Sequence, residues 1–356
     1  MEKPRVAVGM SGGVDSAVSA LLLKEQGYDV VGIFMKNWDE TRDDTGECTA
    51  AEDYDDVRAV CRRLDIPYYT VNFTEQYWQR VFSYFLAEYR RGRTPNPDVL
   101  CNREIKFAAF LDHCLATGAQ KLATGHYCRL SEEGLLLKGA DPAKDQSYFL
   151  CMVPRERFAR VLFPIGHLQK SEVRRLAQEA GLPVAGKKDS TGICFIGERK
   201  FRAFLRQYLP AQPGPMRTLS GELIGQHHGL MYYTLGQRRG LDIGGRGTGE
   251  RWFVVKKDLD NNTLYVEQGA DSPALYSAAL TTEDFNWLAP PIKGERELCA
   301  RFRYRQSDQQ VLVRRQGAGV HIEFARRQRA VTPGQYAVLY EGDVCLGGGV
   351  IGSVIF

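Results

Sequence analysis

Two cysteines stand among residues that suit a reactive thiol, and the first is Cys101. It follows a proline-rich stretch, residues 94–98, and comes just before residues 104–116, whose apolar spacing predicts a helix. The start of a helix lowers the pKa of a thiol and favours the nucleophilic thiolate. The carboxylate of Asp98 would raise that pKa, so we expect Asp98 to handle a proton or to contact a base. A cysteine packed in the core is the competing interpretation.

The second is Cys194, which lies between Gly192 and Gly197 and soon after Lys187 and Lys188. Glycine hinges and nearby positive charge favour a reactive thiol on a loop. The chain has nine cysteines, an odd number, and none forms a C-x-x-C pair. Structural zinc and a disulfide framework are therefore poor interpretations, and reduced thiols of a cytoplasmic protein fit better.

A glycine-rich segment near the N-terminus could bind phosphate; we call residues 9–16 the nucleotide loop. It consists of Gly9, Met10, Ser11, Gly12, Gly13, Val14, Asp15 and Ser16. The glycines let the backbone close on an anion, the serines add hydroxyl donors, and a helix is predicted to start directly afterwards. No Lys-Ser or Lys-Thr pair ends the segment and the G-x-G-x-x-G spacing is absent, which argues against a Walker A loop and a dinucleotide fold.

The elements that must position these residues alternate between strand and helix in the first part of the chain. Predicted strands are Arg5–Met10 and residues 30–35, 67–71 and 121–124, and predicted helices are residues 17–26, 52–64, 75–89 and 104–116. This order predicts an α/β fold with a doubly wound parallel sheet.

The pattern changes near residue 200, where a basic helix, residues 198–208, is followed by Pro210, Pro213 and Pro215. Beyond these prolines, short strands recur around turns such as residues 260–262, a texture typical of small β-barrels. We predict a catalytic domain at residues 1–200, a small β-rich central domain at 201–275 and a C-terminal β-barrel at 276–356.

The net charge of +4 is unevenly distributed, because residues 101–200 carry five more basic than acidic side chains and residues 301–356 four more. Two positive regions could hold a polyanion such as nucleic acid. Residues 301–305 alternate as a strand would, which places three arginines on one face where they could bind phosphates. No apolar run is long enough to span a membrane and no signal peptide is recognisable, so we expect a cytoplasmic protein.

Several segments carry a family resemblance. The nucleotide loop resembles that of the N-type ATP pyrophosphatases, which cleave ATP to AMP and pyrophosphate and adenylate an oxygen of their substrate. Together with further motifs, it resembles the bacterial tRNA-specific 2-thiouridylase family from Val6 almost to the C-terminus. Those motifs are residues 96–101 (Asn-Pro-Asp-Val-Leu-Cys), 124–127, 144–148, 190–197 (Ser-Thr-Gly-Ile-Cys-Phe-Ile-Gly), 233–238 and 345–349.

The resemblance implies ATP-dependent 2-thiolation of the wobble uridine in the tRNAs for Lys, Glu and Gln. It implies a persulfide on Cys194, loaded by a cysteine desulfurase or a sulfur-relay protein, and a transient Cys101–Cys194 disulfide. ATP would bind with Mg²⁺, which Asp15 would help to hold, and Met35 and Gly125 would contact the nucleotide. The target base would meet Asn96, Pro97 and Asp98. Contacts with tRNA are implied for His126, Lys144, Asp145, Gln146, Arg303, Tyr304 and Gln335.

Three alternatives stay open. One is another ATP pyrophosphatase of this loop class that uses ammonia or an amino acid as nucleophile and needs neither thiol. A second is sulfur transfer through a labile iron–sulfur cluster held by the two cysteines, with Asp98 as a third ligand. The third is a tRNA-binding module that has no catalytic activity.

Overall fold

The computed structural model describes residues 3–38, 49–188, 201–244 and 247–356. Its N-terminal part is built on a five-stranded sheet in the order β3-β2-β1-β4-β7, and every neighbouring pair is parallel. The strands are β1 (Arg5–Met10), β2 (Asp29–Lys36), β3 (Tyr68–Asn72), β4 (Lys121–Ala123) and β7 (Val161–Leu162). The order reverses at β1, as the prediction of a doubly wound sheet requires.

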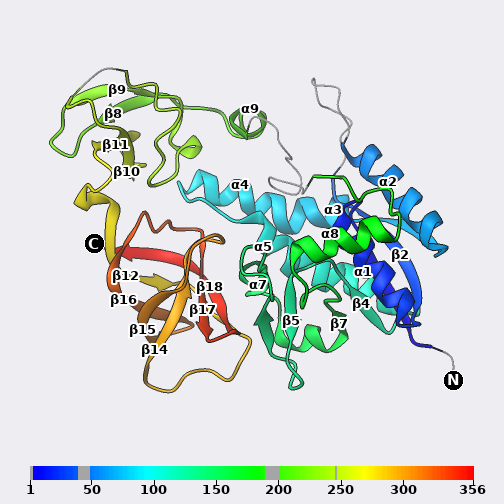
Figure 1. Ribbon diagram of the computed structural model, residues 1–356. Helices are drawn as coiled ribbons and strands as arrows, with labels where there is room; N and C mark the ends of the chain where they lie inside the picture. Colours follow the sequence, from blue (N-terminus) through cyan, green and yellow to red (C-terminus); the bar gives the residue numbers. More distant parts are fainter. Residues whose placement is uncertain (1–2, 39–48, 189–200, 245–246) are drawn as a thin grey trace.

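Helices cover both faces of this sheet (Figure 1). Val6, Val8 and Met10 of β1 pack into one core with α1 (Val14–Glu25), α2 (Thr49–Leu64) and α8 (Lys170–Glu179). Ala7, which points the opposite way, packs into a second core with the helical segments between residues 74 and 116. A strand that is apolar on both sides is typical of a buried parallel sheet.

The helical segments of the second face contain two π-helical stretches. The first segment runs through α3 (Thr74–Tyr77), a π-helical stretch at Trp78–Phe82 and α4 (Ser83–Arg90). The second runs through α5 (Pro97–Cys101), a π-helical stretch at Asn102–Phe110 and α6 (Leu111–Ala116). The prediction that this second helix covers residues 104–116 is therefore wrong at its start, which lies at Pro97. The π-helical stretches were not predicted.

A small central sheet follows the short helix α9 (Phe201–Arg206). Its order is β10-β11-β8-β9. The strands are β8 (Gly214–Arg217), β9 (Leu223–His227), β10 (Trp252–Asp258) and β11 (Thr263–Gln268). The predicted hairpin turn joins β10 to β11, where Asn262 adopts a φ of 46° and Asp258 accepts a hydrogen bond from the backbone of Asn261.

The C-terminal part is a closed barrel of six strands, in the order β12-β16-β15-β14-β17-β18, which closes because β12 also pairs with β18. The strands are β12 (Tyr276–Thr282), β14 (Glu295–Arg301), β15 (Gln309–Gln316), β16 (Gly319–Arg329), β17 (Tyr336–Glu341) and β18 (Val344–Ile355). The short strand β13 (Asn286–Trp287) pairs with β18. The fold class predicted for the whole chain is thus confirmed.

The prediction of one arginine face at residues 301–305 is wrong. Strand β14 ends at Arg301, and the chain then turns, with Gln306 N–H donating to the carbonyl of Arg303. Arg301 enters an ion pair with Asp145, and Arg303 donates to the carbonyl of Ala330. The arginines therefore take separate directions, because the backbone does not stay extended.

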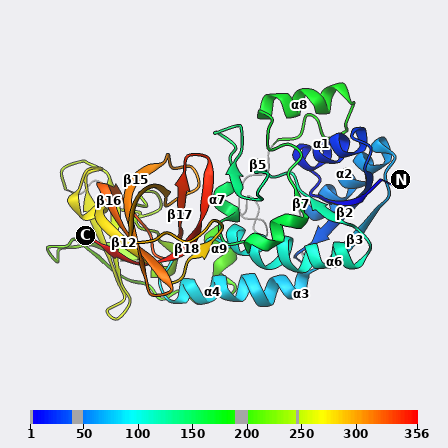
Figure 2. The same cartoon turned by 90° about the horizontal axis from the view of Figure 1, so that it is seen from below.

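The N-terminal part of the chain reaches into the barrel sheet through a hairpin of β5 (Cys128–Leu130) and β6 (Leu136–Lys138). Leu137 of β6 pairs with Val344 of β18. The short helix α7 (Ser147–Leu150) follows this hairpin along the chain. Figure 2 shows the barrel at one end of the molecule and the parallel sheet with its helices at the other. No helix in the described part of the chain is long and apolar enough to cross a membrane.

Candidate nucleotide and thiol site

The nucleotide loop connects the end of β1 to the start of α1. Gly12 has a φ of 74°, and a Cβ there would lie 2.6 Å from the carbonyl oxygen of Asp53, so only glycine fits. Gly13 is the residue that precedes the first turn of α1, and no side chain caps that turn. Ser11 Oγ lies 3.2 Å from Ser16 Oγ. Two hydroxyls and the N–H groups of a helix start therefore converge, which suits a bound phosphate.

The other predicted nucleotide residues reach the same edge of the sheet. Met10 pairs with Phe34, and Val8 pairs with Ala123. Met35 is therefore the second-last residue of β2 and Gly125 lies two residues after β4, so both flank the loop. A Cβ on Gly125 would lie 2.8 Å from both the carbonyl carbon of Asp15 and the nitrogen of Ser16. The site lies at the carboxyl ends of parallel strands where their order reverses, the position at which doubly wound sheets bind ligands.

Lys170 and Tyr127 complete this site, and sequence reasoning missed both. Lys170 Nζ lies 2.7 Å from Asp15 Oδ1, and the Tyr127 hydroxyl donates to the same oxygen at 2.8 Å. Lys170 starts α8, more than 150 positions along the chain, and its side chain is only 11% exposed. No local pattern marks this lysine, because only the tertiary fold brings it to the loop. A cation held here can stabilise phosphate charge.

A second lysine, Lys187, ties the segment that follows α8 to α2. Lys187 Nζ lies 2.7 Å from Asp53 Oδ1 and also bonds to Asp56. Asp53 is the residue whose carbonyl meets Gly12. Lys187 comes just before residues 189–200, which include Cys194. Cys194, and with it the predicted Cys101–Cys194 disulfide, lies outside the described residues.

Cys101 is the last residue of α5 and is fully buried. The helix is capped by Asn96, whose Oδ1 accepts hydrogen bonds from the N–H groups of Asp98 and Val99 at 3.2 and 3.4 Å. Cys101 is thus the fifth helical residue and lies just past the first turn, within which the helix N-terminus acts most strongly. The expectation that Cys101 stands at the helix start is wrong. The π-helical stretch that begins at the next residue is a feature often found at functional sites.

Three other thiols, those of Cys61, Cys114 and Cys345, are fully buried as Cys101 is. Burial raises the pKa of Cys61 to about 11 and that of Cys114 and Cys345 to about 12. These three thiols stay protonated and unreactive at neutral pH.

Gly92, Arg93 and Thr94 form the turn that leads to Asn96, and we call them the junction turn. This turn belongs to the N-terminal part of the chain and is bonded to both the central sheet and the barrel. Lys257 Nζ of the central sheet donates to the carbonyl of Gly92 at 2.9 Å. The barrel contributes Gln335 Nε2, which donates to the carbonyl of Thr94 at 2.7 Å. Residues from three domains therefore fix the approach to the predicted base loop, Asn96, Pro97 and Asp98. Burial lowers the pKa of Lys257 to about 8.

The residues implied to contact tRNA divide into internal and accessible ones. Asp145 and His126 are buried. His126 Nδ1 bonds to Thr124 Oγ1, and burial lowers the pKa of His126 well below its usual value, so this imidazole is neutral. Lys144 and Tyr304 meet between the domains, where the Tyr304 hydroxyl donates to the carbonyl of Lys144. Most of these residues gather where the N-terminal part of the chain meets the barrel.

Comparison with known proteins covers almost the whole chain. Residues 4–198 match a family described as tRNA methyl transferase HUP domain, residues 202–268 its PRC-barrel domain, and residues 277–351 an aminomethyltransferase beta-barrel domain. The chain is 58% identical over 360 residues to tRNA-specific 2-thiouridylase MnmA 1 of Geobacillus kaustophilus, covering 100% of this chain and 97% of that protein. It is 60% identical over 359 residues to tRNA-specific 2-thiouridylase MnmA of Bacillus subtilis, covering 99% and 96%.

Proposed function

We propose a reaction for this chain from the premise that it belongs to the family of the tRNA-specific 2-thiouridylases. The enzyme transfers sulfur to a uridine of tRNA and uses ATP to do so. The observation that carries this proposal is the similarity along nearly the entire chain to proteins of that name, joined to a complete nucleotide loop. The matching domain families are named after enzymes that transfer methyl or aminomethyl groups. Transfer of a methyl group to tRNA would not require ATP cleavage to activate the uridine.

The first step activates the base. The 2-oxygen of the wobble uridine attacks the α-phosphorus of ATP, a P–O bond forms, and pyrophosphate leaves. Negative charge grows on the departing phosphates, where the Ser11 and Ser16 hydroxyls, the first turn of α1 and Lys170 would stabilise it. Met35 and Gly125 would contact the adenine nucleotide.

The second step replaces oxygen by sulfur. A sulfur donor, a cysteine desulfurase or a sulfur-relay protein, loads Cys194 as a persulfide. The terminal sulfur attacks C2 of the adenylated base, AMP leaves with the original oxygen, and the thiolate of Cys101 attacks the inner sulfur of Cys194. This breaks the S–S bond to the transferred sulfur and leaves a Cys101–Cys194 disulfide. A dithiol reductant must then supply two electrons to restore both thiols.

Mg²⁺ would accompany ATP. Asp15 fits this role in chemical type, since a carboxylate oxygen is a ligand that Mg²⁺ prefers, and the ion would neutralise phosphate charge. In this structure the same carboxylate bonds to Lys170 and Tyr127. The alternative of a labile iron–sulfur cluster involves Cys194, which is outside the described residues, and anaerobic purification with a visible absorption spectrum tests it.

Base and tRNA recognition complete the proposal. Asn96, Pro97 and Asp98 would receive the uridine, which must leave its stack before it can react. Lys144, Gln146, Arg303 and Tyr304 lie at the junction of catalytic domain and barrel, which suits contact with the RNA, and His126 and Gln335 are proposed from the family alone. The tRNAs for Lys, Glu and Gln are the expected substrates, and the cytoplasm is the expected location.

The decisive experiment is incubation of the purified enzyme with tRNA, ATP and a persulfide donor, followed by mass spectrometry of the nucleosides. We expect 2-thiouridine and AMP in equal amounts. Cys101→Ser and Cys194→Ser should each form no 2-thiouridine while ATP still binds. Full thiolation by either variant would overturn the thiol mechanism, and AMP formation that does not depend on tRNA would favour another ATP pyrophosphatase.

A further inference from the structure

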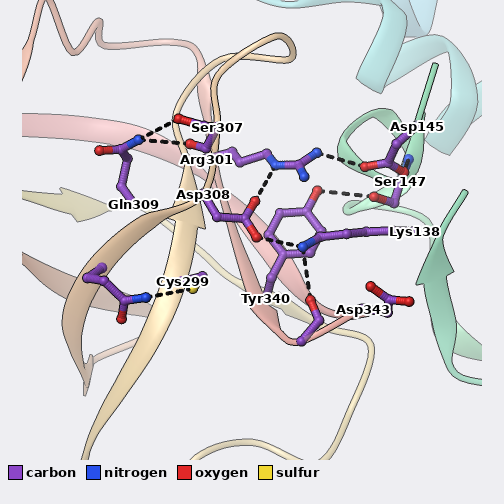
Figure 3. Close-up of polar contacts among 12 residues, drawn as sticks. Lys138, Asp145, Ser147, Cys299, Arg301, Ser307, Asp308, Gln309, Tyr340 and Asp343 are labelled. Carbon is purple, nitrogen blue, oxygen red and sulfur yellow. Dashed lines mark hydrogen bonds and ion pairs between the residues drawn. The ribbon is translucent and has the colours of Figure 1, made fainter. Parts of the chain in front are cut away.

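A largely shielded group of charges joins the N-terminal part of the chain to the barrel; we call Lys138, Asp145, Arg301, Asp308 and Tyr340 the Arg301 cluster (Figure 3). The Arg301 guanidinium lies 2.7 Å from Asp145 and 2.6 Å from Asp308, and Lys138 Nζ lies 2.6 Å from Asp308. Both cations also lie over the ring of Tyr340, at 4.8 and 4.7 Å from its centre. Two cations and two carboxylates therefore balance in charge at the interface.

Asp145 is the member that connects this cluster to the catalytic domain. Its side chain is only 1% exposed, and that of Arg301 is 12% exposed. Besides Arg301, the carboxylate accepts hydrogen bonds from the N–H groups of Gly139 and Ser147 at 3.1 and 3.0 Å. The carboxylate thus closes the loop of residues 139–147 on itself, and its oxygens point into protein.

The same loop continues to the nucleotide site. Gln146 Oε1 accepts a hydrogen bond from the N–H of Tyr127, and Gln146 N–H donates to the carbonyl of Tyr127, both at 3.0 Å. The Tyr127 hydroxyl in turn donates to Asp15 of the nucleotide loop at 2.8 Å. Arg301 is therefore linked to Asp15 in steps: by its ion pair to Asp145, by the peptide bond from Asp145 to Gln146, and by hydrogen bonds from Gln146 to Tyr127 and from Tyr127 to Asp15.

We propose that Arg301 and Asp145 are positioning residues, which hold the 139–147 loop against the barrel so that Tyr127 and Asp15 are correctly placed for ATP. The Asp145 carboxylate then acts through its contacts with Arg301, Gly139 and Ser147. This inference rests on the proposed function, because it assigns ATP to the nucleotide loop. Because Arg301 belongs to the barrel, the nucleotide site would be well formed only after the barrel has docked.

The test measures the affinity for a non-hydrolysable ATP analogue by titration calorimetry in the absence of tRNA. Arg301→Gln and Asp145→Asn should each weaken binding by between about threefold and about thirtyfold, the usual range for changes within a connected network. The double variant should weaken binding by less than the product of the two single effects, because both remove the same interaction.

Arg296→Gln is the matched control, since Arg296 lies on the same strand β14 and pairs with Glu341 in solvent, with side chains 43% and 53% exposed. It should change the ATP affinity by less than about twofold. If Arg301→Gln does not fold, Arg301→Lys, which keeps the charge but loses the paired donors, should show a smaller weakening.

Salt dependence of tRNA binding separates positioning from RNA contact. We expect the slope of log affinity against log salt to be the same in Asp145→Asn, Arg301→Gln and wild type, because no phosphate contact is lost. Folded variants with wild-type ATP affinity would overturn the inference, as would a loss confined to tRNA binding. A wild-type enzyme that binds no ATP would instead refute the proposed function.

Discussion

Replacement of Gly125 by alanine tests how closely the end of β4 must approach the nucleotide loop. The added Cβ would lie 2.8 Å from two backbone atoms of Asp15 and Ser16, whereas ordinary contacts begin near 3.4 Å. The backbone atoms cannot rotate away as a side chain would, so the loop or the strand end must shift. Overpacking of this kind costs about 1–3 kcal/mol. Since 1.4 kcal/mol is a factor of about ten, a cost that appears entirely on binding would lower the affinity for ATP by about fivefold to about 150-fold, and any share already present in the free protein would lower its melting temperature instead.

The assay combines titration calorimetry with an ATP analogue and thermal unfolding of the same samples. Calorimetry reports the part of the strain that appears when the nucleotide binds, and the melting temperature reports the part already present in the free protein. Gly186→Ala is the control, because a Cβ at Gly186 meets nothing within 4 Å and its φ is not left-handed. If Gly125→Ala leaves both the ATP affinity and the melting temperature at the wild-type values, the close approach is not required and the reasoning fails.

Three further predictions follow from the site. Lys170→Gln removes the cation bonded to Asp15, so ATP affinity should fall by about tenfold, a typical cost for a charged hydrogen bond; Lys170→Arg should lose less, and equal losses would contradict the charge argument. Asn96→Ala removes the cap of α5, which should lower the free energy of unfolding by about 1 kcal/mol in urea titrations, and Asn96→Asp should restore it; an unchanged unfolding curve would refute the cap. Burial lowers the pKa of Lys257 from 10.5 to about 8, so between these values the unfolded chain binds more protons and stability should rise with pH. Lys257→Met should abolish this rise relative to wild type, and parallel curves would show that Lys257 does not titrate in that range.

The sequence predicts the fold well because its signals there are local and repeated. Strand β1 is apolar, the glycines after it suit a tight turn, and α1 follows at once, so the order of strands and helices can be followed along the chain. The barrel is similarly marked by short strands at regular spacing. The start of α5 was misplaced because Pro97 and Asp98 resemble a loop, although proline at the first helical position and asparagine before it are favourable there.

The site is predictable only in part, for a different reason. Residues of the nucleotide loop are contiguous, so their chemistry is visible in the sequence. Lys170 and Tyr127 are not, because they reach Asp15 from separate elements. Lys170 belongs to no local pattern, and the motif at residues 124–127 does not show that Tyr127 meets Asp15. The sequence predicts Arg301 as one of three arginines on a single face. In the structure β14 ends at Arg301, and its side chain pairs with the buried Asp145, a contact that no local pattern indicates.

The junction turn has a consequence for the order in which the enzyme becomes competent during synthesis. All the residues expected to hold ATP lie before residue 171. The hydrogen bond to the Thr94 carbonyl, in contrast, can form only after Gln335 has been synthesised, 241 positions later. At about 5–20 residues per second, that interval is roughly 10–50 s. A nascent chain that still lacks the barrel should bind ATP only weakly, because Arg301 also comes from the barrel, and its base loop should not yet have reached its final position. Premature cleavage of ATP is then limited by the missing acceptor, because the uridine cannot be placed until the barrel has been made and has docked.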